Sequence, residues 1–336
     1  MTSRQFRTDE NAAFERPRRR TRPRTKDRPS YSEAEVGVVI TVDRGRFRVL
    51  LGGHETTATK ARQLGRTGVI VGDRVRIVGD TSGEEGTLGR IVEVEERTTV
   101  LRRTADDDDP YERPIVANAD QLVIVTALAD PPPRTGMIDR ILVAGFDAGL
   151  DPLLCLTKAD LAGPEELLAQ YEPLGVLVQT VQPGADLTEL RAALAGRTSV
   201  FVGHSGVGKS TLVNALIPDA HRGIGAVNEV TGRGRHTSSS AIALRLPPVA
   251  GSDARGAEDG GWVIDTPGVR SFGLSHVTRE SIIAAFPDLQ AQTAGCSRGC
   301  THETGVPECG LDAAVARGEL SRARLESFRR MIDAGQ

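Results

Sequence analysis

The segment from Gly203 to Thr211 constrains the fold of this chain more than any other part of the sequence. It lies between a short apolar run and a segment with helical character, the setting that the pattern G-x-x-x-x-G-K-[ST] requires. There, glycines let backbone N–H groups turn onto a phosphate, and the N-terminus of the following helix adds a favourable dipole. The motif predicts an α/β nucleotide-binding domain and consists of Gly203, His204, Ser205, Gly206, Val207, Gly208, Lys209, Ser210 and Thr211.

Two residues of this phosphate loop have specific expected roles. Lys209 is expected to bridge the β- and γ-phosphates of a nucleotide, and the Ser210 hydroxyl to ligate Mg²⁺. Asp265-Thr266-Pro267-Gly268 follows a later strand-like run. There, Asp265 is expected to hold the same Mg²⁺ through water, and the N–H of Gly268 to sense the γ-phosphate.

A second motif, Thr157-Lys158-Ala159-Asp160, predicts which base is bound. It follows the apolar run 152–156 and matches [NT]-K-x-D. The Asp160 carboxylate can accept from both N1–H and the exocyclic amine of guanine, a pairing that adenine cannot offer. A site built this way rejects the wrong base because its carboxylate would be left unpaired. Lys158 is expected to pack over the purine. Thr157 replaces the commoner Asn, and its shorter side chain predicts a weaker tie between the base and phosphate loops.

The base-reading motif precedes the phosphate loop, which reverses the usual order and indicates a circular permutation. The segment Gly-Arg-Gly-Arg-His-Thr, residues 232–237, occupies the place of the first switch. Thr237 is the best candidate for a γ-phosphate-dependent Mg²⁺ ligand, with Ser238 as the alternative. Val269 follows Gly268 where many GTPases carry a water-orienting Gln, so slow intrinsic turnover is expected. His236 is our candidate for an internal group that replaces it.

The pattern along the chain predicts several domains, as expected for 336 residues. Residues 31–103 read as short strands separated by turns, which favours a small all-β barrel of the oligonucleotide-binding (OB) type; an SH3-like barrel is the alternative. An acidic run marks a linker at residues 104–114. In residues 115–275, strands alternate with helices, which indicates a mostly parallel sheet covered on both faces. Expected strands are 121–127, 152–156, 176–181 and 199–202, expected helices 137–148, 164–171, 187–194 and 209–216, and an expected hairpin joins 241–246 to 262–265.

Three of the four cysteines cluster near the C-terminus. Cys296, Cys300, His302 and Cys309 supply three thiolates and one imidazole, a closed tetrahedral set suited to one structural Zn²⁺. Four protein ligands leave no open position, so no metal catalysis is assigned to this site. Residues 276–336 are expected to form a small zinc-binding helical domain, with a helix over residues 319–333.

The first 30 residues carry ten basic and four acidic side chains, while the whole chain has a formal charge of −3. Such an arginine-rich, proline-broken stretch predicts a disordered basic tail. Two readings are compatible: a solvated tail, or an arm that binds a phosphate backbone. The sequence lacks both a long apolar run and the apolar core of a signal peptide. A cytoplasmic protein with no membrane partner is expected.

The combined motifs resemble the ribosome small-subunit-dependent GTPase A family, whose members are circularly permuted. The resemblance covers residues from about 35 to 330. It includes the segment 117–121 (Ala-Asn-Ala-Asp-Gln), both nucleotide motifs, residues 232–237, Asp-Thr-Pro-Gly-Val-Arg, and the Cys/His cluster. Two departures stand out. The metal-ligand spacing has one loop shorter and one longer than the family's usual C-x4-C-x-H-x5-C. The fifth GTPase element, normally a Ser-Ala pair, reads Gln179-Thr180-Val181.

The resemblance implies an enzyme that converts GTP and water to GDP and phosphate and assists late maturation of the small ribosomal subunit. It implies hydrolysis stimulated by that subunit and coupled to release, with Mg²⁺ and one Zn²⁺ as cofactors. The partners implied are the small subunit and its rRNA, and a monomer is expected. The alternative is a GTP-controlled rRNA-binding checkpoint with negligible turnover. A metabolic P-loop kinase is disfavoured by Asp160.

Overall fold

Five strands in the first part of the described chain close into a barrel. The computed structural model describes residues 31–65, 68–104, 111–218, 240–248, 260–269, 272–274 and 277–334. Every second residue of one strand is buried, so Phe47, Val49 and Leu51 face the barrel core. The strands are β1 (Glu35–Asp43), β2 (Arg46–Leu51), β3 (His54–Lys60), β4 (Arg74–Gly79) and β5 (Gly89–Val94), and a short 3₁₀ helix η2 (Arg62–Leu64) follows β3.

The pairing of these strands identifies the barrel type. They are ordered β1-β2-β3-β5-β4, and β4 pairs with β1 to close the ring. The β3–β5 pair is parallel and the other pairs are antiparallel. This is the five-stranded Greek-key barrel of the OB type, which confirms that expectation over the SH3-like alternative.

A separate two-stranded sheet comes between the barrel and the α/β part of the sequence. β6 (Val100–Arg103) pairs antiparallel with β7 (Arg113–Ala117). Residues 105–110 of the expected linker lie outside the described residues. The last two residues of that linker, 113 and 114, belong to β7. The backbone N–H of Ala117 then donates to the carbonyl of Val71 at 3.0 Å, which joins β7 to the barrel.

The α/β part contributes six strands, in the order β10-β9-β8-β11-β13-β12, to a sheet that continues into the barrel where β12 pairs antiparallel with β1. The first five strands are parallel, and β12 runs antiparallel beside β13. All seven residues of β8 are buried, as expected for a strand covered on both faces. The strands are β8 (Gln121–Ala127), β9 (Asp151–Thr157), β10 (Leu177–Thr180), β11 (Thr198–Gly203), β12 (Ile242–Leu246) and β13 (Gly261–Asp265).

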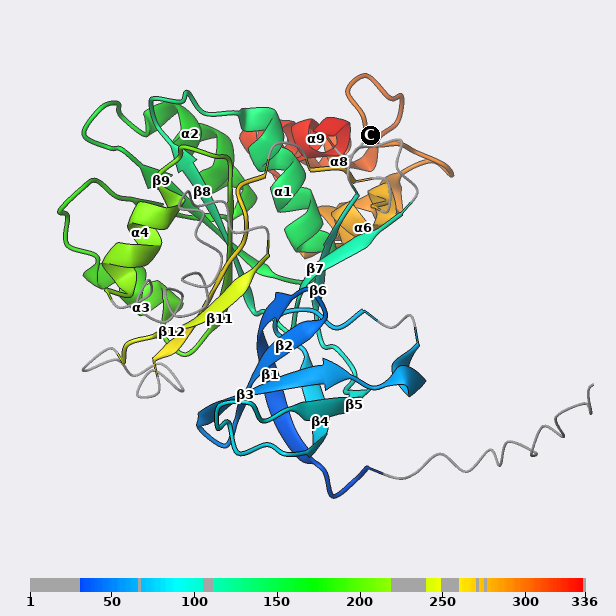
Figure 1. The fold of residues 1–336 in the computed structure, drawn as a ribbon. Coiled ribbons are helices and arrows are strands. Elements are labelled where there is room, and N and C mark those ends of the chain that lie inside the picture. Colours follow the sequence, from blue (N-terminus) through cyan, green and yellow to red (C-terminus); the bar gives the residue numbers. More distant parts are fainter. Residues whose placement is uncertain are drawn as a thin grey trace, which may run out of the picture. The chain divides into compact units, whose positions relative to one another are not determined.

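Alternate residues of β8 enter two different cores. Leu122 and Ile124 belong to a core shared with α1 (Thr135–Asp147) and α2 (Glu165–Tyr171). Val123 and Val125 belong to the core shared with α3 (Thr188–Leu194) and α4 (Lys209–Leu216). Because successive side chains of a strand point to opposite faces, the sheet has a core and covering helices on each face (Figure 1).

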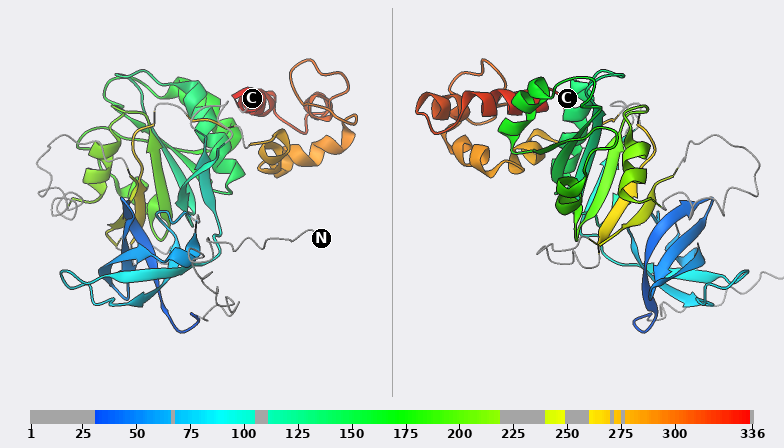
Figure 2. Two further views of the ribbon diagram at one scale, coloured as in Figure 1. Left: turned by 45° about the vertical axis from the view of Figure 1, so that its right-hand side comes forward. Right: turned by 90° about the vertical axis from the view of Figure 1, so that its left-hand side faces the viewer.

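The C-terminal helices extend the first of these cores. Phe286, Leu325, Phe328 and Met331 are buried and pack in the cluster that contains α1. Both views of Figure 2 show these helices beside those of the α/β domain. They are α6 (Arg279–Ala284), α7 (Pro287–Gln292), α8 (Gly310–Ala316) and α9 (Arg322–Ala334), with 3₁₀ turns η3 (Glu172–Leu174) and η5 (Thr293–Gly295).

Most expected elements are present, with bounds shifted by at most three residues. The helix at residues 209–216 has the expected bounds. The last helix begins at Arg322 rather than residue 319, because the Ser321 hydroxyl accepts from the N–H of Arg324 and acts as its cap. None of the helices that the structure describes has the length and apolar character needed to cross a membrane.

Candidate nucleotide-binding site and metal centre

Three sequence motifs meet at one edge of the sheet, because each follows the carboxyl end of a parallel strand. Thr157 ends β9, Gly203 ends β11 and Asp265 ends β13. The register is direct: Phe201 pairs with Asp265, and Gly203 pairs with Val125 of the intervening β8. Ligand sites of open α/β sheets lie outside this edge. The structure therefore brings together three motifs that are spread over more than a hundred residues of the sequence.

The phosphate loop has the backbone that its glycines predict. Gly206 and Gly208 have φ values of 87° and 86°, a region that residues with a Cβ rarely adopt. Gly203 lies so close to the carbonyl oxygen of Val125 that a Cβ there would overlap it. α4 begins at Lys209 directly after the loop, so the N–H groups of its first turn have no partners within the helix. The arrangement suits an anion.

Lys209 connects the phosphate loop to the end of β13. Its side chain is buried, its ammonium pairs with the Asp265 carboxylate, and it donates to the Thr266 carbonyl at 2.5 Å. The Thr266 hydroxyl donates in turn to the Phe201 carbonyl at 2.7 Å. The lysine that is expected to contact phosphate is therefore in direct contact with the carboxylate that is expected near Mg²⁺. Ser210 and Thr211, the next residues of α4, are exposed.

Thr157 ties the base loop, Thr157 to Asp160, directly to the phosphate loop. Its buried hydroxyl donates to the Val207 carbonyl at 2.5 Å and lies 3.2 Å from the Thr126 carbonyl. The sequence led us to expect a weaker tie at this position because threonine is shorter than asparagine. The structure shows that the tie is present, because β9 and the loop after β11 lie close enough for the threonine hydroxyl to reach. That the tie is weaker than one made by asparagine stays a prediction.

Lys158 and Ala159 of the base loop are held by hydrogen bonds to backbone carbonyls, and Asp160 is exposed. Lys158 has a φ of 57°, and its ammonium donates to the carbonyl of Asp130. The N–H of Ala159 donates to the Val181 carbonyl at 3.2 Å, so the expected fifth element contacts this loop through its backbone. Sequence reasoning missed Asp130. The run of three prolines that follows it, 131–133, was the available signal for a rigid turn.

Val269 lies in the core beside the phosphate loop. Its side chain is 7% exposed, and its N–H donates to the Gly203 carbonyl at 3.0 Å. Val269 therefore packs against apolar neighbours. This agrees with the expectation that no side chain at this position orients the attacking water. His236, Thr237 and the rest of the expected first switch lie outside the described residues, so their positions stay predictions.

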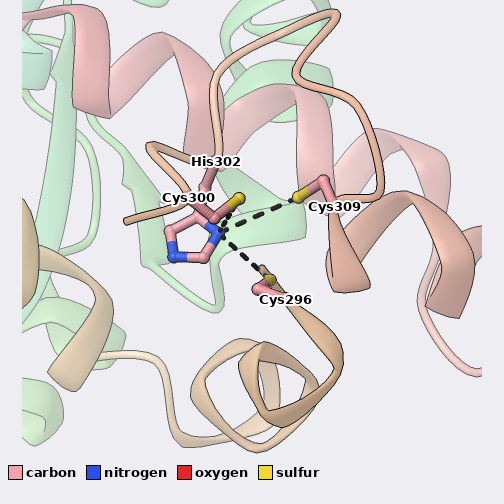
Figure 3. Close-up of side chains that lie close together, drawn as sticks. All are labelled: Cys296, Cys300, His302 and Cys309. Carbon is pink, nitrogen blue, oxygen red and sulfur yellow. Dashed lines mark hydrogen bonds between the residues drawn. The ribbon is translucent and has the colours of Figure 1, made fainter. Parts of the chain in front are cut away.

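The four expected metal ligands converge in the C-terminal part of the chain (Figure 3). The Nδ1 atom of His302 lies 3.6 Å from the Sγ atom of Cys296, 3.5 Å from that of Cys300 and 3.8 Å from that of Cys309. All four ligand atoms lie within 4.8 Å of one another. The unusual loop lengths thus still bring the ligands together, and the set suits one metal ion.

Residues outside the ligand set fix its shape. The N–H of Gly310 donates to the Cys296 sulfur at 3.1 Å, and Arg329 donates from Nε to the His302 carbonyl at 2.9 Å. The guanidinium of Arg329 also makes two bonds, of 2.9 and 2.6 Å, to Asp312 and holds the pKa of that carboxyl below its usual value. Burial, followed by the charge of Arg329, lowers the pKa of His302. No spacing rule pointed to Arg329, which lies twenty residues beyond the last ligand.

Comparison of the sequence with known proteins identifies the family of this chain. The model of the family "RsgA GTPase" matches residues 94–275. The chain is 38% identical over 277 residues to small ribosomal subunit biogenesis GTPase RsgA 1 of Vibrio vulnificus, covering 79% of this chain and 74% of the relative. The chain belongs to the RsgA GTPase family. The family resemblance drawn from the motifs is confirmed.

Other RsgA proteins and solved structures agree with this assignment. RsgA of Azotobacter vinelandii is 38% identical over 273 residues, with the same shares of both chains covered. The crystal structure of YjeQ from Thermotoga maritima superposes with a TM-score of 0.64 at 26% identity, covering 90% of this chain and 98% of that one. The structure of YloQ, described as a circularly permuted GTPase, gives a TM-score of 0.61 at 24% identity, covering 92% and 97%. The predicted multidomain, permuted fold is confirmed.

Replacing Thr157 tests the tie between the two loops. Thr157→Val keeps the shape of the side chain but leaves the Val207 carbonyl without its donor, which costs about 1–1.5 kcal/mol. We expect the dissociation constant for GDP, measured by fluorescence titration, to rise about five- to tenfold. Thr157→Ser, which keeps the hydroxyl, is the control and should stay close to the wild type. Equal affinity of the valine and serine variants would contradict this role.

Proposed function

We propose that this RsgA GTPase hydrolyses GTP to GDP and phosphate and assists late maturation of the small ribosomal subunit. The observation that carries the proposal is the meeting of Asp160, Lys209 and Asp265 at one sheet edge, on a chain with the RsgA fold. The relatives named above carry the name "small ribosomal subunit biogenesis GTPase". The partners we propose are the small subunit and its rRNA.

Each residue of the site has a proposed role. Asp160 reads guanine, Lys158 packs on the base, and Thr157 with Ala159 holds the loop. The phosphate-loop amides and Lys209 bind the phosphates, Ser210, Thr237 and Asp265 hold Mg²⁺, and Gly268 senses the γ-phosphate. Bound Mg²⁺ would neutralise charge on the phosphate oxygens. The ion pair between Asp265 and Lys209 supports these roles, because it places the proposed Mg²⁺ residue beside the proposed phosphate residue.

The buried Val269 supports the proposal that turnover depends on a partner. A valine neither donates nor accepts, so a water-orienting group must come from elsewhere. Completion of such a site is worth roughly 10³–10⁵ in kcat. His236 is the internal group that we propose, and contact with the small subunit would bring it into use. GTP hydrolysis would then be coupled to release of the protein.

We propose that different domains of the protein bind rRNA and the nucleotide. The OB barrel (31–103) and the C-terminal domain (276–336) would contact rRNA, joined by a linker (104–114) and the GTPase domain (115–275). The basic residues 1–30, outside the described residues, would add salt-dependent affinity for phosphate. We propose that the protein acts as a monomer in the cytoplasm.

The same buried Val269 favours a second candidate function. If no group completes the site, nucleotide occupancy rather than turnover would control rRNA binding, and the protein would act as a checkpoint. The decisive quantity is therefore the hydrolysis rate in the presence of the subunit.

We expect purified small subunits to raise the GTP hydrolysis rate of this protein at least about a hundredfold, because the isolated site lacks a water-orienting side chain. The measurement is phosphate release with and without subunits, with ATP as competitor. His236→Ala should lose most of the stimulation while still binding GDP. Absence of stimulation in the wild type would favour the checkpoint, and unchanged stimulation in His236→Ala would exclude that residue.

We also propose that the Cys/His site holds one structural Zn²⁺. Zn–S and Zn–N bonds of about 2.3 and 2.0–2.1 Å in a tetrahedron separate sulfur from nitrogen by about 3.6 Å. The three sulfur–nitrogen distances here are 3.6, 3.5 and 3.8 Å. Three thiolates with one imidazole are also a donor set that favours zinc.

Metal analysis of the purified protein should therefore find one zinc ion per chain. Cys309→Ala removes one ligand and should lower both the zinc content and the melting temperature. Cys155→Ala is the matched control: this cysteine is buried in β9, burial raises its pKa to about 12, and it should leave the zinc content unchanged. Equal loss of zinc in both variants, or a different metal, would contradict the assignment.

A further inference from the structure

Helix α9 presents three donors at successive turns to the end of α2. Arg324, Ser327 and Arg330 are three residues apart, so they lie on one face of the helix. Arg324 donates to the Pro173 carbonyl at 2.7 Å, and Ser327 donates to the Gln170 carbonyl at 3.0 Å. Arg330 donates to the same Gln170 carbonyl at 3.2 Å. Carbonyls at the end of a helix lack partners within it, and cations are favourable there, so α9 caps α2 and η3.

Arg330 also joins α2 to α1 through a charge pair whose carboxylate is buried. Its Nε atom donates to Asp139 of α1 at 3.0 Å, and the Asp139 side chain is only 2% exposed. The guanidinium lies 5.1 Å from the ring centre of Tyr171, the last residue of α2. The Tyr171 hydroxyl donates to the carbonyl of Thr135 at 3.3 Å, at the start of α1. One side chain therefore fixes where two helices meet.

The neighbouring residue of α9 holds the metal loop. Arg329 donates to the His302 carbonyl and pairs with Asp312 of α8, as described above. Consecutive residues of one helix thus contact the metal centre and the junction of α1 with α2. In Figure 1, α9 lies beside α1, and the buried cores of the two helices are continuous.

Both helices at this junction lead directly to the base loop. α2 begins five residues after Asp160. α1 begins five residues after Asp130, whose carbonyl accepts from the Lys158 ammonium. A shift of either helix would therefore move a segment that holds the guanine-reading residues.

We propose that α9 is a latch that couples occupancy of the metal site to guanine-nucleotide affinity, with Arg330 and Asp139 as positioning residues for the base loop. The latch stiffens the base loop when the metal loop is ordered and loosens it when the metal is lost. The inference rests on the proposed guanine and metal sites, and it adds a route between them that does not pass through the Asp265–Gly268 segment.

The test neutralises the latch without leaving a buried charge unpaired, since removing one partner of such a pair is strongly destabilising. The double variant Asp139→Asn/Arg330→Gln is compared with Arg317→Gln/Glu319→Gln. The control removes an exposed ion pair of 2.7 Å at the end of α8. For the full-length chains, the measurements are zinc content, the dissociation constant for GDP, and amide hydrogen exchange in segments 157–164 and 203–211.

The latch variant should keep one zinc ion per chain, bind GDP about tenfold more weakly, and exchange faster in residues 157–164 but not in 203–211. A general loss of stability would instead speed exchange in both segments. Chelating zinc from the wild type should reproduce the weaker GDP binding, and chelation should add little to the latch variant. Arg330→Lys should retain part of the affinity.

The outcomes separate this inference from the function on which it rests. A wild type that does not bind GDP would overturn the guanine site itself. A wild type that binds GDP, together with a latch variant of equal affinity and equal exchange in residues 157–164, would overturn the latch alone.

Discussion

The hydrogen-bonded ladder between parallel strands β9, β8, β11 and β13 is the constraint on which the site depends. In a parallel sheet all carboxyl ends lie at the same edge, whatever the order in which the strands occur along the chain. Thr157, Gly203 and Asp265 end three of these strands and therefore meet there. The permuted order of motifs changes which segments are connected, and it leaves the geometry at this edge intact.

The changed connections have physical consequences. Because β13 is the last strand of the sheet in the sequence, the Asp265–Gly268 segment leads directly toward the C-terminal helices. The carbonyl of Phe272, just beyond it, accepts from Arg140 of α1 at 2.8 Å. Helix α9 then returns to the junction of α1 and α2 near Asp139. The C-terminal domain thus follows directly after the Asp265–Gly268 segment and contacts the junction of α1 with α2.

Local sequence patterns predicted most of the fold, because they depend on short-range chemistry. The glycines at 206 and 208 permit the positive φ values of the phosphate loop, and the spacing of Cys296 to Cys309 indicated one ligand cluster. Burial on both faces of β8 followed from its unbroken apolar run. The same patterns gave the correct family from one sequence.

Long-range contacts were beyond reach of the sequence. The Thr157 hydroxyl reaches the Val207 carbonyl only because the fold brings two loops close together, so this partner could not be named from the sequence. Arg329 and Arg330 are ordinary helix residues until the fold places His302 and Asp139 beside them. The role of Lys158 toward Asp130 likewise required knowledge of where the proline run lies.

Guanine specificity rests on the Asp160 carboxylate, and replacing one of its oxygens by an amide nitrogen tests that role. Asp160→Asn replaces two acceptors by one acceptor and one donor, a pattern that fits xanthine instead of guanine. Binding of GDP and xanthosine diphosphate should be measured for the wild type, Asp160→Asn and the exposed control Asp186→Asn. We expect Asp160→Asn to lose at least about 100-fold in GDP affinity and to gain xanthosine diphosphate binding, while the control is unchanged. Undiminished GDP binding by Asp160→Asn would contradict that role.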